Sequence, residues 1–89
     1  MINMEKLSDM VNIGPEVEKQ LMAVGINSPE ELIAAGSKKA WLKIYSIDSS
    51  ACIHRLAALE GAVRGIKKSL LPDEVKEDLK KFYKEAKGR

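Results

Sequence analysis

The sequence is poor in cysteine, histidine and aromatic residues, and each shortage excludes a class of site. Among 89 residues there is one cysteine, Cys52, and one histidine, His54. A single cysteine excludes an internal disulfide and is typical of a reducing compartment, so we expect a cytoplasmic protein. Two positions apart on a helix, the two side chains point to different sides, which excludes a Cys/His zinc site within one chain. We accordingly predict no metal site, no cofactor and no catalytic residues.

Aromatic residues make up 4% of the chain, so the core must consist mainly of aliphatic side chains. We expect Trp41 to anchor that core. Because Phe82 and Tyr83 are adjacent on a helix, both cannot face the same core, so Tyr83 is a candidate for a partner surface. No apolar run reaches the ~20 residues that span a bilayer, so we expect no membrane association. Glu5 and Asp9 interrupt the N-terminal segment, and we expect no signal peptide.

Helical periodicity with abrupt stops accounts for the chain, and no alternating strand pattern occurs. We predict an all-α fold, a single domain over residues 1–89 built as a compact bundle of five to six short helices. The predicted helices span about 3–11, from Pro15 to a stop at Gly25, from a Ser28 cap to Gly36, from a Ser37 cap past Tyr45, about 50–66, and onward from Leu71-Pro72. Glu31 completes a capping box with Ser28, and Gly14 offers left-handed backbone between the first two helices.

Residues 3–26 have the layout of a helix-hairpin-helix element, whose hairpin is Asn12, Ile13, Gly14 and Pro15. In such elements the hairpin N–H groups and a helix N-terminus can hold a backbone phosphate. Here Asn12 replaces the first hairpin glycine, Pro15 has no N–H, and Glu16 follows. Residues 1–36 carry two basic and six acidic side chains, which repel phosphate. We therefore favour a packing or protein-binding role for the hairpin.

Residues 37–72 have the opposite balance, with seven basic and two acidic side chains. The basic residues form a possible nucleic-acid face: Lys38, Lys39, Lys43, Arg55, Arg64, Lys67 and Lys68. Trp41 and Tyr45 beside the first three lysines would add aromatic stacking to that face. The alternative, which we favour, is that Trp41 lies in the core and the lysines are solvated.

The helix over about 50–66 carries a stripe of small residues, Ala57, Gly61 and Gly65, that recurs every four positions. Each glycine inside a helix costs about 1 kcal/mol relative to alanine, so a neighbour packed close to the bare backbone should offset that cost. We predict a close helix contact at this stripe, within one chain or, alternatively, in a dimer. On the same helix Glu60 and Arg64 are spaced to form an ion pair.

A series of short motifs extends beyond the hairpin: Leu7, Asn12 to Pro15, Glu18-Lys19 with Leu21, Gly25-Ile26, Glu31-Leu32, Gly36, Ala40-Trp41, Leu56 to Ile66, and Leu71-Pro72. On these residues, above all the stretch from Leu56 to Ile66, the chain resembles the C-terminal domain of the TfoX (Sxy) competence-regulator family over nearly its whole length. The resemblance implies an all-helical domain of helix-hairpin-helix type in a bacterial protein linked to competence-gene regulation. Full-length members also carry an N-terminal domain. Because the motifs here match the C-terminal domain alone, we expect a stand-alone copy of that domain.

Two functions follow as competing hypotheses. The first is a non-enzymatic interaction module, a small bacterial regulatory or adaptor protein that binds a protein partner as a monomer or homodimer. The alternative is a weak, sequence-independent nucleic-acid binder that uses the basic segment 37–72. An enzyme built on Asp48, Ser49, Ser50 and His54 is a third hypothesis that we do not favour, because a helical turn scatters them and no oxyanion or phosphate loop accompanies them.

Overall fold

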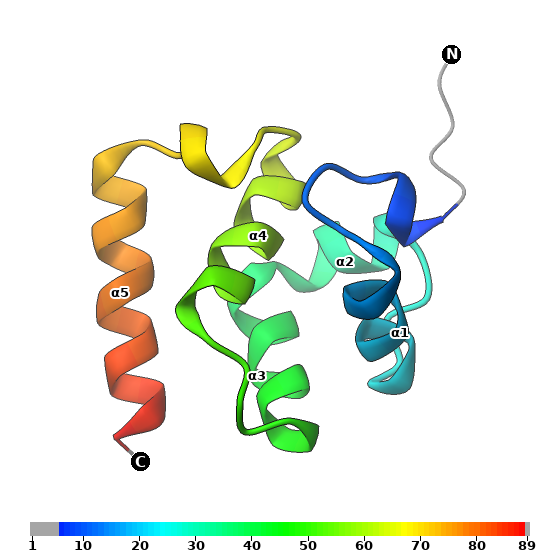
Figure 1. The fold of residues 1–89 in the computed structure, drawn as a ribbon, viewed down its shortest axis with the longest axis horizontal. Helices are drawn as coiled ribbons and strands as arrows, with labels where there is room; N and C mark the ends of the chain where they lie inside the picture. The colour runs from blue at the N-terminus through cyan, green and yellow to red at the C-terminus, as the bar shows by residue number, and fades with distance from the viewer. Residues whose placement is uncertain (1–5, 89) are drawn as a thin grey trace.

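Glycine, proline and serine residues mark most helix boundaries in the computed structural model, which describes residues 6–88 (Figure 1). The elements in chain order are η1 (Leu7–Asp9), α1 (Pro15–Ala23), α2 (Pro29–Ala35), α3 (Ser37–Ile47), α4 (Ile53–Arg64), η2 (Lys68–Leu70) and α5 (Asp73–Lys87), where η denotes a 3-10 turn. No strand occurs within the described range. The predicted all-α fold of five to six short helices is confirmed. None of the helices in residues 6–88 is long and apolar enough to cross a membrane.

The N-terminal hairpin differs from the prediction. In place of a helix over 3–11, the described residues contain the single 3-10 turn η1, and residues 3–5 lie outside the described range. The helix-hairpin-helix element predicted for about 3–26 is therefore not confirmed. The left-handed backbone falls on Asn12, with φ 69°, whereas Gly14 has an ordinary φ of −93°. Asparagine tolerates this region better than other residues with a side chain.

Side-chain hydrogen bonds help to set the boundaries of α2 and α3. The Ser28 hydroxyl accepts the N–H of Glu31 at 3.2 Å, as predicted. The Glu31 carboxylate accepts the N–H of Asn27 at 3.0 Å, one residue before the position that a standard capping box uses. Ser37, predicted as a cap, is instead the first residue of α3, and its buried hydroxyl donates to the Glu60 carboxylate at 2.5 Å.

Trp41 lies at the centre of the core and is fully buried, which confirms its predicted role. Its ring stacks on Tyr45 with centroids 4.9 Å apart, and its indole N–H donates to the carbonyl of Cys52 at 3.2 Å. Phe82 and Tyr83 both approach it edge-on, with centroids at 6.2 Å and 5.5 Å. The expectation that both rings cannot face the same core is thus wrong, because a large central ring offers its face and edges to two adjacent residues of α5. Tyr83 is partly buried, and its contact with a partner stays a prediction.

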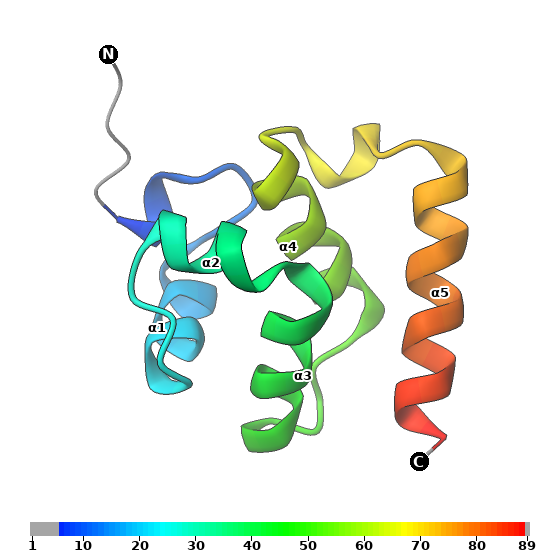
Figure 2. The same cartoon turned by 180° about the vertical axis from the view of Figure 1, so that it is seen from behind.

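Helix α4 packs against both α3 and α5. Figures 1 and 2 show that α4 and α5 both meet η2 at the same end of the molecule, so the two helices run antiparallel. Helices α1 and α2 lie on the far side of α3 and α4 from α5. The pair α4 and α5 therefore has η2 across one end.

The small-residue stripe of α4 is divided between different roles. Gly61 is buried, and a Cβ atom there would overlap the side chain of Asn12 and come within 2.6 Å of the carbonyl oxygen of Ile66. The close neighbours are thus the hairpin and the chain after α4 rather than another helix. Gly65 does not join such a contact, because it ends α4 in the left-handed conformation with φ 77°, and a Cβ atom there would have no neighbour within 4 Å.

Candidate functional site

Three of the seven residues of the predicted nucleic-acid face are paired with carboxylates inside the fold. The pairs are Lys38 with Asp78 at 2.7 Å, Arg55 with Asp48 at 3.7 Å, and Arg64 with Glu60 at 2.5 Å. The Lys38 ammonium also lies 5.4 Å from the centre of the Phe82 ring. Its hydrogen bond to Asp78 lowers the pKa of that carboxyl group. These three cations are therefore partly neutralised by their own fold.

The remaining four residues of that face, Lys39, Lys43, Lys67 and Lys68, are exposed and have no carboxylate partner among the described residues. They come from two places. Lys39 and Lys43 are one turn apart on α3, whereas Lys67 and Lys68 follow α4 at the start of η2. The free positive charge of the predicted face is thus divided between two elements.

The hairpin is tied to the rest of the fold through Asn12. Its side-chain N–H₂ group donates to the carbonyls of Ala58 at 3.3 Å and Ile66 at 3.0 Å, and its carboxamide oxygen accepts the N–H of Lys68 at 3.2 Å. Nearby, the Glu18 carboxylate accepts the N–H of Ser8 at 2.9 Å. The hairpin side chain is therefore occupied by packing contacts, and a carboxylate already takes up a backbone N–H group of η1.

Cys52 and His54 have different environments at the start of α4. Cys52 is half-buried, and His54 is exposed. Burial raises the pKa of the Cys52 thiol, but the backbone N–H groups of Arg55 and His54 lower it, and the net shift is downward. Asp48 accepts hydrogen bonds from the N–H and the hydroxyl of Ser50, at 3.0 Å and 2.5 Å, so the carboxylate closes its own turn.

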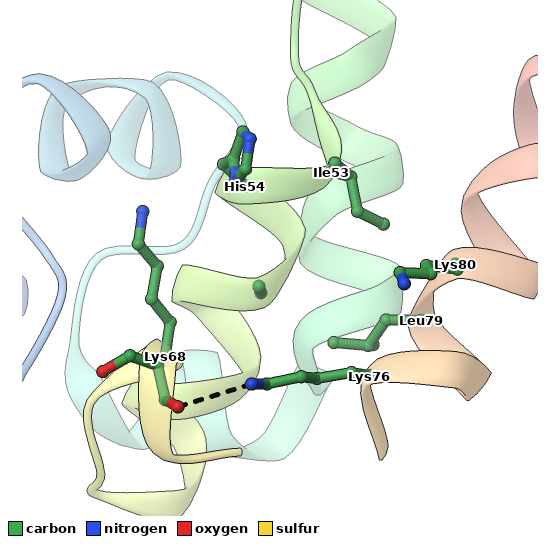
Figure 3. A pocket seen from close by; sticks show the side chains of 8 residues that line it. Ile53, His54, Lys68, Lys76, Leu79 and Lys80 are labelled. Carbon is green, nitrogen blue, oxygen red and sulfur yellow. Dashed lines mark hydrogen bonds between the residues drawn. The ribbon is translucent and has the colours of Figure 1, made fainter. Parts of the chain in front are cut away.

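A cleft of about 330 Å³ lies between α4, η2 and α5, and sequence reasoning missed most of its lining (Figure 3). Its lining residues are Ile53, His54, Ala57, Lys68, Ser69, Lys76, Leu79 and Lys80. None of them comes from α3. Ile53, Ala57 and Leu79 give this α4–α5 cleft an apolar floor.

The α4–α5 cleft has positive charge at its rim and no carboxylate among its lining residues. The Lys76 ammonium donates to the carbonyl of Ser69 at 3.4 Å, as the dashed line in Figure 3 shows. Lys80 makes an ion pair with Glu77 at 3.6 Å, but both side chains are more than 60% exposed, so the pair contributes little. Lys68 has no carboxylate partner in the described part of the chain. The cleft thus combines an apolar floor with uncompensated positive charge.

Two further hollows have a different character. One is lined by Lys38, Glu60, Arg64, Glu74, Val75, Asp78 and Leu79, and the other by Lys38, Asp78, Lys81, Phe82 and Glu85. Both contain acidic as well as basic side chains, with the Lys38–Asp78 pair in each and the Arg64–Glu60 pair in the first. Across residues 6–88 no group of three or more potential ligands could hold a metal ion.

Comparison with known proteins matches most of the chain to one family. Residues 3–83 match the TfoX C-terminal domain. The chain belongs to this family. Protein Sxy of Escherichia coli (strain K12) is 35% identical over 68 residues, which are 76% of this chain and 32% of Sxy. The chain thus spans about a third of the length of that curated relative. The relationship makes it a relative of TfoX-type competence regulators.

Two crystal structures share the fold of this TfoX C-terminal domain. An uncharacterized protein from Listeria monocytogenes in a triclinic form is 46% identical, with a TM-score of 0.91 over 93% of this chain and 94% of that chain. A tetragonal form of a protein of unknown function from the same organism is also 46% identical, with a TM-score of 0.87 over 89% and 98%. In this family member the motif stretch from Leu56 to Ile66 forms most of α4, one wall of the cleft.

Proposed function

We propose that this TfoX C-terminal domain is a non-enzymatic interaction module, a small regulatory or adaptor protein that docks a protein partner in the cytoplasm. The observation that carries the proposal is the α4–α5 cleft, whose floor is apolar. Concave apolar surfaces with a few polar groups are the usual form of binding sites. The single half-buried cysteine fits a reducing compartment.

The experiment is affinity capture from bacterial extract with the full chain as bait, run with and without nuclease. Ala57→Phe fills the cleft from its floor, and Ala57→Ser is the matched control that leaves it open. We expect a protein that survives nuclease treatment to be retained by the wild type and by Ala57→Ser and lost with Ala57→Phe. Retention by Ala57→Phe, with the variant folded by circular dichroism, would refute docking at the cleft.

Weak, sequence-independent nucleic-acid binding is the second candidate, favoured by the free lysines of α3. Lys39 and Lys43 are exposed on one face, one turn apart. If duplex DNA binds there, affinity falls steeply with salt, and Lys39→Glu with Lys43→Glu abolishes it. These two positions suit the test better than Lys38, whose replacement would also break its pair with Asp78. Absence of binding at low salt would remove this candidate.

A further inference from the structure

We infer that the α4–α5 cleft takes an acidic amphipathic helix of a partner protein, which names the partner of the docking site and so rests on the proposed function. The floor supplies the first reason. Ile53 and Ala57 are one turn apart on α4, and Leu79 faces them from α5. A partner helix with apolar side chains three or four residues apart on one face would contact this floor at successive turns.

The shape of the site supplies the second reason. Its lining comes from α4 and α5, which run antiparallel (Figure 1), and from Lys68 and Ser69 of η2. Side-chain ridges of one helix pack into the surface grooves of another, so a partner helix could pack on α4 and α5 together. This packing favours a helix as the occupant of the cleft.

The rim supplies the third reason and sets the charge of the partner. Lys68, Lys76 and Lys80 surround the apolar floor from η2 and α5, with His54 on the α4 side, as Figure 3 shows. No lining residue is acidic. Carboxylates flanking the apolar face of a partner helix would meet these ammonium groups, and such complementarity speeds association and selects the partner.

A nucleic-acid backbone matches this site less well than a helix does. Phosphates would satisfy the lysines but would leave the exposed parts of Ile53 and Ala57 in contact with water. A second copy of this chain is the other competitor, since α2 carries Glu30 and an Ile33 side chain that is 54% exposed. Docking of that helix in the cleft of another copy would make binding depend on the concentration of the protein itself, which the test below measures.

The test uses two synthetic helical peptides of about 16 residues, long enough for a helix to form. One has leucines on one face flanked by glutamates, and the other replaces every glutamate with lysine. Binding to the full isotope-labelled chain is followed by NMR. We expect the glutamate peptide to shift the resonances of Ile53, Ala57 and Leu79 in a salt-dependent way and the lysine peptide to leave them unchanged.

Charge reversal provides the matched control. Lys68→Glu with Lys80→Glu should weaken the glutamate peptide about tenfold or more, whereas Lys39→Glu with Lys43→Glu, the same charge change on α3, should alter it less than about twofold. Equal binding of both peptides, binding unaffected by the cleft pair, or absence of shifts at the floor would each overturn the inference. Floor resonances that move with the concentration of the protein alone would do so as well, in favour of a second copy.

Failure of this inference is distinguishable from failure of the proposed function. If Ala57→Phe abolishes capture while Lys68→Glu with Lys80→Glu does not, a protein docks in the cleft but its helix is not acidic. If neither variant affects capture, docking at the cleft itself is wrong.

Discussion

The side chain of Asn12 lies against the backbone of Gly61, where any larger residue of α4 would project its Cβ atom. The asparagine reaches this position from a left-handed backbone with φ 69° and bonds two carbonyls and one N–H group of the α4–η2 segment. The bare backbone of residue 61 makes room for the side chain of residue 12. The two positions therefore act as one contact.

Gly61→Ala should destabilise the protein although alanine is the better helix former. The propensity gain is about 1 kcal/mol, but the new methyl group overlaps Asn12 and sits 2.6 Å from the carbonyl oxygen of Ile66, which cannot move independently of the backbone. We expect a net loss of about 1–3 kcal/mol in the free energy of unfolding, measured by chemical denaturation. A gain in stability would contradict the close packing.

A double-mutant cycle separates the overlap with Asn12 from the contact with the Ile66 carbonyl oxygen. Gly61→Ala and Asn12→Ala should be coupled, so the double variant loses less than the sum of the single losses. Gly65→Ala is the control, because Gly65 has φ 77° and open space around it. Its loss of about 1–2 kcal/mol comes from the left-handed backbone and should add to that of Asn12→Ala.

Asn12→Asp should be more harmful than Asn12→Gly at neutral pH. Aspartate keeps the shape but places a carboxylate against the carbonyls of Ala58 and Ile66, where the amide donated two hydrogen bonds. Glycine loses the same bonds but adopts positive φ freely. We expect losses of about 3 and about 1–2 kcal/mol, respectively. The gap should narrow in acid, where the aspartate is protonated; a constant gap across pH would argue against the carbonyl contacts.

Ser37→Ala should cost more stability at neutral pH than in acid. Burial raises the pKa of Glu60, but hydrogen bonds from Ser37 and Arg64 lower it by more. The resulting pKa lies below the ordinary value of 4.5. A depressed pKa stabilises the fold above that ordinary value, and the contribution is lost as pH falls through the folded pKa.

Removing the serine hydroxyl should raise the Glu60 pKa and cost about 1–2 kcal/mol at about pH 7, with a smaller cost at about pH 3. NMR titration of the Glu60 side chain and denaturation at both pH values provide the two measurements. Ser46→Ala is the control, since its exposed hydroxyl donates only to the carbonyl of Lys43. A Glu60 pKa unchanged in Ser37→Ala would show that the bond carries no weight.

Tyr83→Ala should behave as a core substitution. The ring lies 5.5 Å from that of Trp41, and the Lys87 ammonium lies 5.4 Å from its centre. We expect a loss of about 2–4 kcal/mol and a change in the near-UV circular dichroism of Trp41. Leu70→Ala, at a side chain that is 66% exposed, should change stability by less than about 0.5 kcal/mol. Similar effects of the two variants would show that the Tyr83 ring does not contribute to the core.

Local signals predict most of the fold. Pro29 after Ser28, and the glycines at 25 and 36, begin and end helices through backbone preferences that act within a few residues, and the structure places the boundaries there. The errors arise where a distant partner decides. Ser37 has the local features of a cap, but its hydroxyl bonds Glu60, 23 positions away. Glycine preference favours Gly14 for the left-handed conformation, yet contacts 46 or more positions away fix it on Asn12.

The candidate site is harder to predict than the fold. Lys68 stands out in the sequence for its charge, but Lys76 and Lys80 look like an ordinary solvated helix face. The one signal available in the sequence is that Lys76 and Lys80 lie one helical turn apart with Leu79 between them, which would place both lysines beside that apolar side chain. Nothing in the sequence says which face of α4 meets α5 and which stays open, because Ile53 and Ala57 satisfy the same helical periodicity as the core residues.

The hydrogen bonds of Asn12 also constrain the order in which the chain can fold. They join residues 46, 54 and 56 positions apart. During synthesis from the N-terminus, the hairpin cannot reach its final state until Lys68 has emerged, so η1 and its connection to α1 wait for most of the protein to be translated. A ribosome that stalls before that point would present a nascent chain whose hairpin lacks the three hydrogen bonds of Asn12.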